Sequence, residues 1–319
     1  MMMKEEDLSE IFRPIYQERM KALNAEHMSL AYYTSATTGL NILRGRELWM
    51  RAAACMNDYR EIDYGIQLLN RAIYGSEERR QRIRLLAYRL HWGNSMLEDL
   101  LGDLNHNENR LITKTYLACV SEHTEEENCR GRLSMWRAYG RRTGVAFVLK
   151  AAPLLQTRRE LPLRITPVEY LDEDGFAKGI DRMIRAVELH VEELQQADPA
   201  IMLSCFVETV LFSLFSIKHP GFVEEKEWRI VYQEMDEHLS YDLVSVDGIP
   251  QIVYKVPVLG VGEPGPGLQL EEMLDRIVIG PTQYADVVCT AFVRALEEMG
   301  ITHAAQRVCK SNIPLRQEK

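Results

Sequence analysis

Several features by which protein classes are recognised are missing from this sequence. Its six cysteines are scattered without a CxxC pair, and none of its eight histidines stands three or four residues from another. This pattern argues against a disulfide framework and against a structural zinc site. No GxSxG motif occurs, and Cys119 and His123 are neighbours without the surroundings of a thiol enzyme. We therefore expect no bound metal and no hydrolase of these types.

Long apolar runs and an excess of positive charge are also lacking. No apolar stretch reaches the length that a membrane span needs. The chain carries 38 Lys and Arg against 47 Asp and Glu, a balance that argues against general binding to nucleic acid or anionic membranes but allows a locally basic site. The opening residues 1–20 are acidic and amphipathic, unlike a signal peptide. We expect a cytoplasmic protein of bacterial type.

Apolar residues, by contrast, are plentiful and follow two kinds of pattern. Hydrophobic residues make up 46% of the 319 residues, enough for a sizeable core. Segments rich in β-formers, such as "EWRIVYQE" and "IPQIVYKVPVLG", alternate with segments of helical spacing. This order predicts an α+β fold, a mostly antiparallel split sheet with inserted helices.

The same patterns predict how the chain is divided. Residues 1–28 predict an N-terminal helical segment, and residues 29–319 predict a single α+β domain. A strongly helical block at about 173–216, broken near Asp198–Pro199, predicts a helical insertion within that domain. Its role as a lid, a dimer surface or scaffold stays open.

A glycine-rich segment, "GVGEPGPG", carries the letters of a dinucleotide-binding fingerprint at Gly260, Gly262 and Gly265. Such a site needs a helix to begin inside the loop, because the helix N-terminus holds the pyrophosphate. Pro264 and Pro266 stiffen the loop instead, and no helical pattern starts before Leu268. The segment predicts a turn.

The stretch "YYTSATTGLNIL" is the first of three candidate functional segments. It places two aromatic rings and two hydroxyls at a strand end just before a helix. Alternation puts Tyr33 and Ser35 on one face of the strand and Tyr32 and Thr34 on the other. The simpler interpretation is one buried tyrosine, with Ser35 or Thr37 capping the helix.

The second segment, "GRLSMWRAYGRRTG", is a basic patch in an acidic protein. Its arginines could accept phosphates, and its rings Trp136 and Tyr139 could stack on a base or a nicotinamide. The simpler interpretation is a solvated arginine face over an aromatic core anchor. The arginines are Arg130, Arg132, Arg137, Arg141 and Arg142.

The third segment, "VEEKEWRIV", places carboxylates at the entrance of an apolar strand. A strand from Lys226 would put Glu225, Glu227 and Arg229 on one face. One carboxylate could then bind a ribose hydroxyl or stabilise an oxocarbenium cation while the other positions a nucleophile. The simpler interpretation is an edge-strand charge cluster in which Glu pairs with Arg229.

Taken together, these segments resemble an uncharacterised bacterial family, domain of unknown function 2971. The resemblance covers roughly residues 31–316 and rests on several motifs in the family's order. They are "YYTS", "ELWM", "MNDYREIDYG", "ACVSE…SMWRAYG…GVAFVL", "IKHPGFVEEKEWRIV" and "IVIGP…SNIPLR".

A more distant resemblance is to ADP-ribosyltransferases, in the order of a first-strand Tyr-Thr element, a middle aromatic element and a late Glu-x-Glu strand. By this fold-level analogy, Thr34 or Tyr33 would hold the nicotinamide ribose, and Ser121 or Trp136 would frame the ring. Glu227, with Glu225 as its partner, would stabilise the cationic transition state. Arg137 and Arg141 would meet the pyrophosphate.

These resemblances imply an NAD-dependent ADP-ribosyltransferase or NAD glycohydrolase, a candidate toxin or phage-defence effector with NAD as cofactor. Its acceptor would be an unidentified protein or nucleic acid, or water. The alternative is a nucleotide-sensing or interaction module without catalysis. A third hypothesis is nucleic-acid processing through the basic patch and the helix "RRQRIRLLAYRL". Homo-oligomerisation stays open, and no membrane partner is expected.

Overall fold

The computed structural model describes residues 8, 11–25, 28–56, 61–93, 95–106, 113–140, 142–157, 161–234, 239–246 and 248–314. The chain forms two compact units, and each unit is assembled from three separate segments. Unit 1 contains Met1–Lys21, Ala54–Thr113 and Thr166–Val223, whereas unit 2 contains Ala22–Ala53, Lys114–Ile165 and Glu224–Lys319. The two units thus alternate along the sequence.

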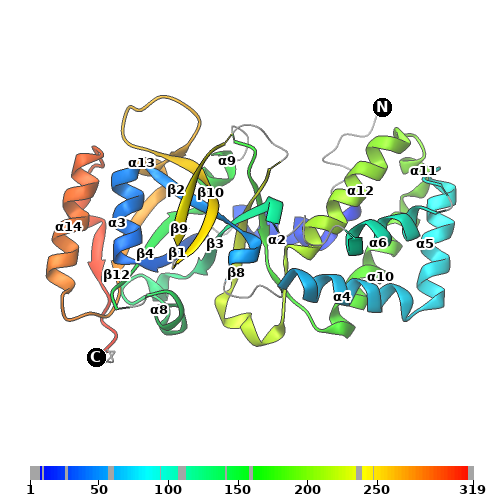
Figure 1. Cartoon of the computed structure of the whole chain (residues 1–319), viewed down its shortest axis with the longest axis horizontal. Helices are drawn as coiled ribbons and strands as arrows, with labels where there is room; N and C mark the ends of the chain where they lie inside the picture. Colours follow the sequence, from blue (N-terminus) through cyan, green and yellow to red (C-terminus); the bar gives the residue numbers. More distant parts are fainter. Residues whose placement is uncertain are drawn as a thin grey trace. The chain divides into compact units, whose positions relative to one another are not determined.

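Unit 2 is built around a largely antiparallel open sheet (Figure 1). The strand order is β11-β10-β2-β3-β1-β4-β12-β13, with β9 paired to β10 and β8 paired to β3. Only the pairs β10–β11 and β12–β13 are parallel among these. The predicted mixed fold with a mostly antiparallel sheet is confirmed. The strands are β1 (Ser29–Ser35), β2 (Glu47–Ala52), β3 (Thr115–His123), β4 (Gly144–Lys150), β8 (Glu227–Gln233), β9 (Ser240–Val246), β10 (Ile249–Leu259), β11 (Leu268–Gln269), β12 (Leu274–Ile279) and β13 (Val308–Lys310).

Helices cover both faces of this sheet. On one face, α3 packs so closely on β4 that a Cβ added at Gly39 would lie 2.7 Å from a Val145 methyl carbon. Ser35 caps α3 as expected, accepting the Thr38 backbone N–H at 3.1 Å. On the other face, α8 packs on β1 and β4. The helices of unit 2 are α3 (Ala36–Gly45), α8 (Leu133–Tyr139), α9 (Ala151–Thr157), α13 (Leu270–Met273) and α14 (Ala285–Glu298), with the short helices η2 (Glu125–Glu127) and η4 (Ala304–Gln306).

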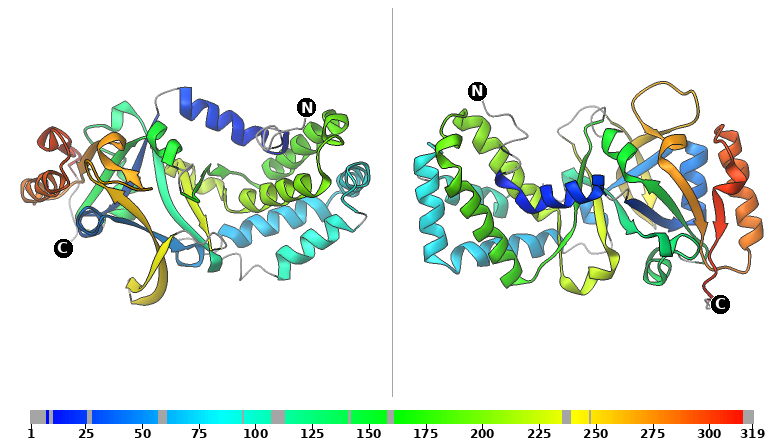
Figure 2. Two further views of the ribbon diagram at one scale, coloured as in Figure 1. Left: turned by 90° about the horizontal axis from the view of Figure 1, so that it is seen from above. Right: turned by 180° about the vertical axis from the view of Figure 1, so that it is seen from behind.

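Unit 1 is mainly helical, as the two views of Figure 2 show. The rings of Phe12, Trp92 and Phe206 form its aromatic centre, with centroids 5.0–6.1 Å apart. Bidentate ion pairs join α5 to α10, Arg79 to Asp181 and Arg82 to Glu188. Its elements are α4 (Glu61–Tyr74), α5 (Glu77–Arg89), α6 (Met96–His106), α10 (Glu173–Leu189), α11 (Val191–Leu194), α12 (Pro199–Leu214) and the parallel pair β6 (Glu169–Tyr170) and β7 (Ile217–Lys218).

Among the elements whose full bounds the structure describes, four lead from one unit into the other along the chain. They are α2 (Pro14–Ala25), η1 (Ala53–Cys55), β5 (Arg164–Pro167) and η3 (Pro220–Glu225). The helical block expected at 173–216 lies in unit 1 as α10, α11 and α12, and Asp198 caps α12 through two backbone N–H groups. Between α5 and α6, His91 and Gly93 take positive φ angles of 59° and 91°, which end one helix and separate it from the next.

The core between α8 and the sheet is arranged around the indole of Trp136. This side chain is 3% exposed, and its neighbours include Tyr33, Ala146 and Val278. Glycines line the ring: a Cβ added at Gly131, Gly144 or Gly280 would lie 2.5–3.0 Å from an indole carbon. Even one methyl group there would overlap the ring, so these glycines leave the space that Trp136 fills.

We expect Gly144→Ala to destabilise the protein by about 1–3 kcal/mol, the usual cost of overpacking a core. The added Cβ would stand 2.6 Å from the Gly140 Cα and 3.0 Å from Trp136, so backbone must move. Urea unfolding followed by tryptophan fluorescence measures the change. Gly45→Ala is the matched control, because a Cβ at Gly45 meets nothing within 4 Å. Equal stability of the two variants would contradict this description of the core.

Candidate functional site

Three of the candidate residues share one face of adjacent strands in unit 2. Ser121 on β3 is directly opposite Ala31 on β1 and directly opposite Glu227 on β8. Tyr33 is two residues along β1 from Ala31 and so lies on the same face. Thr34 belongs to the opposite face, where it is half-buried. The strands therefore bring Tyr33, Ser121 and Glu227 together and turn Thr34 away from them.

The hydroxyl of Tyr33 is occupied by a structural hydrogen bond. It accepts the backbone N–H of Arg132 at 2.9 Å, and its ring meets Trp136 edge-on at a centroid distance of 4.9 Å. Burial raises the pKa of Tyr33 to about 12, so this phenol stays neutral at physiological pH. Its neighbour Tyr32 likewise has its pKa raised to about 12 by burial.

Arg132 is the centre of a hydrogen-bond network. From the sequence it was expected only as one member of a basic patch. Its Nη1 donates to Ser121 Oγ at 2.6 Å, and its Nε donates to Glu127 Oε1 at 2.8 Å. The same guanidinium reaches the backbone oxygens of Glu122, Glu224 and Glu225 at 2.6–3.1 Å. All three of its nitrogens are therefore engaged. Arg132 is committed to holding chain segments together and has no N–H left for a phosphate.

Glu227 is buried and paired. It is 6% exposed, and its Oε1 accepts the Nε–H of Arg229, itself 2% exposed, at 2.8 Å. The pairing of Glu with Arg229 therefore occurs, but on an interior strand, because β8 has neighbours on both sides. A buried ion pair of this kind is costly to break, since each partner would be left with an uncompensated charge.

Glu225 does not share that strand face, and the expected alternation from Lys226 is wrong. Glu225 ends the 3₁₀ helix η3, and β8 begins only at Glu227. Lys226 between them has a φ angle of +43°, which interrupts the extended backbone. The backbone oxygen of Glu225 accepts hydrogen bonds from Ser121 Oγ and from Arg132. Ser121 is buried at this junction.

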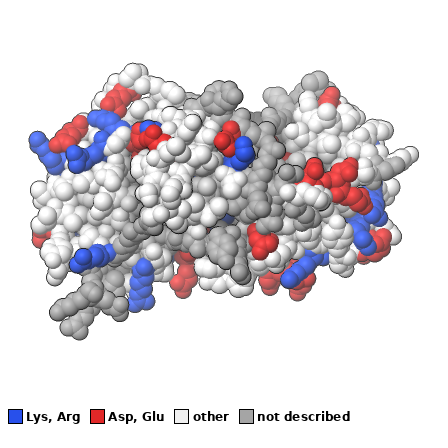
Figure 3. All heavy atoms as spheres, viewed as in Figure 1, with Lys and Arg blue, Asp and Glu red and all other residues white. Residues whose placement is uncertain are grey.

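The aromatic and arginine candidates of the patch separate into buried and exposed groups. Trp136 is enclosed, and its Nε1 donates to the Arg130 backbone oxygen at 2.7 Å. Tyr139 is half-buried against the same core, whereas Arg137 is exposed on α8. Arg141 lies outside the described residues. On the molecular face drawn in Figure 3, basic and acidic side chains are interspersed.

His123 extends this network at the end of β3. It is buried, and its ring Nε2 lies 3.0 Å from Asn128 Oδ1. Its Nδ1 has no hydrogen-bond partner within the described structure and is 3.8 Å from Glu127 Oε2. Burial lowers the pKa of His123 from its ordinary value of 6.5, although Asn128 and Glu127 act in the opposite direction. Burial thus disfavours protonation of the ring.

One comparison with known proteins found a match to part of the chain that contains this site. A model of the family described as "Protein of unknown function (DUF2971)" matches residues 135–230, a segment from α8 to β8 that contains Trp136 and Glu227. The resemblance stated from the motifs is confirmed over this segment. No curated protein and no solved structure matches the chain. In the described part of the chain, no helix is long and apolar enough to span a bilayer.

We expect the free energy of unfolding to fall as the pH drops below 6.5, in part because of His123. The unfolded chain takes up a proton near that pH, whereas the folded chain resists protonation until its lowered pKa is reached. His123→Asn should remove this part of the pH dependence. Urea unfolding between about pH 7.5 and 5 measures this pH dependence. This range lies above the pH values at which protonation of carboxylates dominates the change in stability.

The control for this experiment is His303→Asn, which replaces an exposed histidine of the same unit. His303 has a φ angle of +54°, a conformation that asparagine tolerates. His303→Asn should leave the pH dependence as in the wild type. An unchanged slope in His123→Asn would show that burial of this ring does not couple folding to protonation.

Proposed function

We propose that the protein is an interaction module without catalysis at the predicted glutamates, and that it associates with a second copy of itself through the edge strand β9. The exposed β9–β10 hairpin is the observation that supports this proposal. Among the described strands, β9 pairs with β10 alone. Its outer edge therefore presents unpaired backbone N–H and C=O groups, which readily pair with another chain.

The distal part of this hairpin projects from the sheet. The neighbouring strand β2 pairs with β10 only from Val253 to Pro257, so Ile249–Ile252 have β9 as their strand partner. The left view of Figure 2 shows the hairpin, in yellow and gold, extending away from the other strands. Tyr241 and Leu243 lie on one face of β9 and are 59% and 79% exposed. A two-stranded ribbon with exposed apolar side chains is marginally stable by itself, so a partner would stabilise it.

The sequence of β9 suits pairing with its own copy. Antiparallel pairing about a two-fold axis at Leu243, the middle residue of Ser240–Val246, places Leu243 opposite the same residue of the second copy. Tyr241 then faces Ser245, and Asp242 faces Val244. No two like charges are opposed across the strands, and the apolar face continues from one hairpin to the other.

We expect the wild-type protein to form a dimer and Leu243→Lys to weaken it by about tenfold or more, equivalent to about 1.4 kcal/mol. The substitution would place two lysines opposite each other at the two-fold axis. Sedimentation equilibrium over a concentration series measures the dissociation constant. Val287→Lys is the control, since Val287 is a 71% exposed apolar residue on α14 of the same unit.

A cross-linking experiment tests the register of the proposed β9–β9 pairing, in addition to the dissociation constant of the dimer. Leu243→Cys should form a disulfide-linked dimer under mild oxidation, because self-opposed residues of antiparallel strands bring their Cβ atoms within reach of a disulfide. The wild type, whose exposed Cys129 is a background thiol, sets the baseline. A monomeric wild type at all concentrations would rule out the proposal. If Leu243→Lys leaves the dissociation constant of the dimer unchanged, the dimer interface is not at β9.

NAD cleavage is the second candidate, as an ADP-ribosyltransferase-like glycohydrolase or transferase. The observation in its favour is that Tyr33, Ser121 and Glu227 share one face of β1, β3 and β8, in the order that the analogy requires. The burial of Glu227 and its pairing with Arg229 weigh against it, because a catalytic carboxylate must reach the ribose. The roles as toxin or phage-defence effector depend on this candidate.

We expect that neither the wild type nor Glu227→Gln releases nicotinamide from NAD. Chromatography of the reaction mixture, with and without added cell lysate, measures the release. The lysate supplies acceptors that a strict transferase would need. Glu227→Gln preserves the shape of the side chain and an oxygen that can accept from Arg229. Release by the wild type, lowered about a hundredfold or more in Glu227→Gln, would instead establish electrostatic catalysis by this residue.

A further inference from the structure

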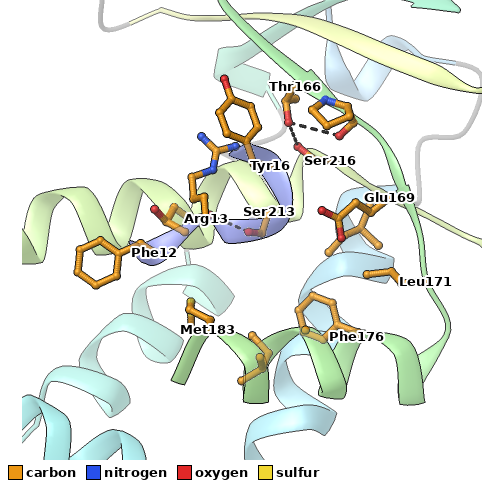
Figure 4. A pocket seen from close by; sticks show the side chains of 15 residues that line it. Phe12, Arg13, Tyr16, Thr166, Glu169, Leu171, Phe176, Met183, Ser213 and Ser216 are labelled. Atoms are coloured by element: carbon orange, nitrogen blue, oxygen red, sulfur yellow. Dashed lines mark hydrogen bonds between the residues drawn. The ribbon is translucent and has the colours of Figure 1, made fainter. Parts of the chain in front are cut away.

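Unit 1 contains a cavity of about 100 Å³, which is not lined by the candidate site residues of unit 2. Its walls come from the segment around Phe12, from β6 and from helices α10 and α12 (Figure 4). All the lining residues belong to unit 1. A cavity of this size corresponds to about three water molecules, or to a compact ligand of about five heavy atoms.

Most of the cavity wall is apolar. Phe12 and Phe176 supply aromatic surface, and Ile180 and Met183 of α10 supply aliphatic surface. In Figure 4, Phe176 and Met183 extend from α10 and Phe12 belongs to the N-terminal segment. Such a wall favours an apolar body and leaves specificity to the few polar groups that converge on it.

Three hydroxyl groups in the wall, those of Thr209, Ser213 and Ser216, donate their protons to backbone oxygens and keep lone pairs that can accept hydrogen bonds. Ser213 Oγ donates to the Thr209 backbone oxygen, and Thr209 Oγ1 donates to the Cys205 backbone oxygen, each at 2.8 Å. Ser216 Oγ donates to the Phe212 backbone oxygen at 2.6 Å. Each hydroxyl has one proton, so what remains toward the cavity is lone pairs.

Glu169 is the one carboxylate in the wall, and its oxygens are also acceptors. It extends from β6 toward the cavity in Figure 4, where its carboxylate is half-buried. Its side chain makes no hydrogen bond or ion pair with the residues that the structure describes. Burial raises the pKa of Glu169, while the charges of Arg19, Arg13 and Arg182 act in the opposite direction. The carboxylate is thus short of a direct counter-charge.

The nearest basic side chain in the wall is turned to aromatic rings. The Arg13 guanidinium carbon lies 4.0 Å from the Tyr16 ring centroid and 5.3 Å from that of Phe212. This stacking holds the guanidinium over two ring faces. The cavity therefore offers acceptors and apolar surface, which is complementary to a donor-rich cationic group on a small hydrocarbon body.

We infer that this cavity is a binding site for a small primary ammonium compound, with Glu169 and the wall hydroxyls accepting its three N–H groups and α10 enclosing its apolar body. A ligand of about five heavy atoms has a limited binding energy, so the dissociation constant for such a probe falls in about the millimolar range. This site is independent of β9, which belongs to unit 2.

Isobutylamine is the probe, because it has a branched four-carbon body and one ammonium group. Ligand-observed NMR titration of the full chain should give saturable binding. Isobutanol, which has the same shape without the charge, should bind about tenfold more weakly, in line with the loss of a charge-assisted hydrogen bond. Isobutyrate should not bind, because its carboxylate would face Glu169.

Two variants assign the binding to this cavity. Glu169→Gln should weaken isobutylamine binding by about tenfold or more while preserving the side-chain shape. Gly179→Leu should block all probes, because Gly179 lines the cavity and an added Cβ meets nothing within 4 Å there. Glu173→Gln, a change of an exposed carboxylate on α10 that pairs with Arg71, is the matched control and should bind as the wild type does.

Thermal unfolding of each variant verifies that unit 1 remains folded. The inference is overturned if the wild type shows no saturable binding of isobutylamine. It is also overturned if Glu169→Gln binds isobutylamine as well as the wild type does, or if isobutanol binds as tightly as the amine. Binding that survives Gly179→Leu would place the amine site outside this cavity.

Discussion

The guanidinium of Arg132 is the interaction on which the arrangement of unit 2 around β3 depends. It binds the end of β3 through Ser121 and Glu122, the short helix η2 through Glu127, and the approach to β8 through Glu225. Its own backbone N–H binds Tyr33 on β1. Because the group is largely buried, leaving any of these donors unmade would carry a desolvation cost. The Arg132 side chain therefore positions three segments, and its backbone N–H adds β1 as a fourth.

That network also explains why the predicted site residues converge without forming an open site. Ser121 and Tyr33 face the same side of the sheet as Glu227, yet both hydroxyls bind Arg132. The backbone at Lys226 departs from an extended conformation, and its carbonyl accepts the Glu122 N–H at 2.9 Å, which offsets part of the conformational cost. Ser121 and Tyr33 were candidates for a functional site because they are polar. In the structure they take part in the network that joins β3 to β8.

Local patterns in the sequence predicted much of the secondary structure but little of the site. Period-two segments indicated β8 and β10, and Ser35 caps α3 as one interpretation had it, because these features depend on neighbouring residues. The strand β9 was missed, since its exposed sequence "SYDLVSV" has no buried alternation. Trp136 is an aromatic core anchor, as the simpler interpretation had it, but the glycines that make room for its ring stand at positions 131, 144 and 280 and could not be linked to it from the sequence. The cavity near Glu169 likewise combines residues from Phe12 to Ile217.

The alternation of the two units along the chain sets an order for folding during synthesis. All segments of unit 1 have been made once Val223 is added, whereas β8, β10, β12 and β13 of unit 2 come later. The early strands β1, β3 and β4 must therefore wait with unpaired edges, although the β1–β4 and β1–β3 pairings are already available to them. During that interval the edges that β8 and β12 later occupy are open, whereas all segments of the helical unit are already present.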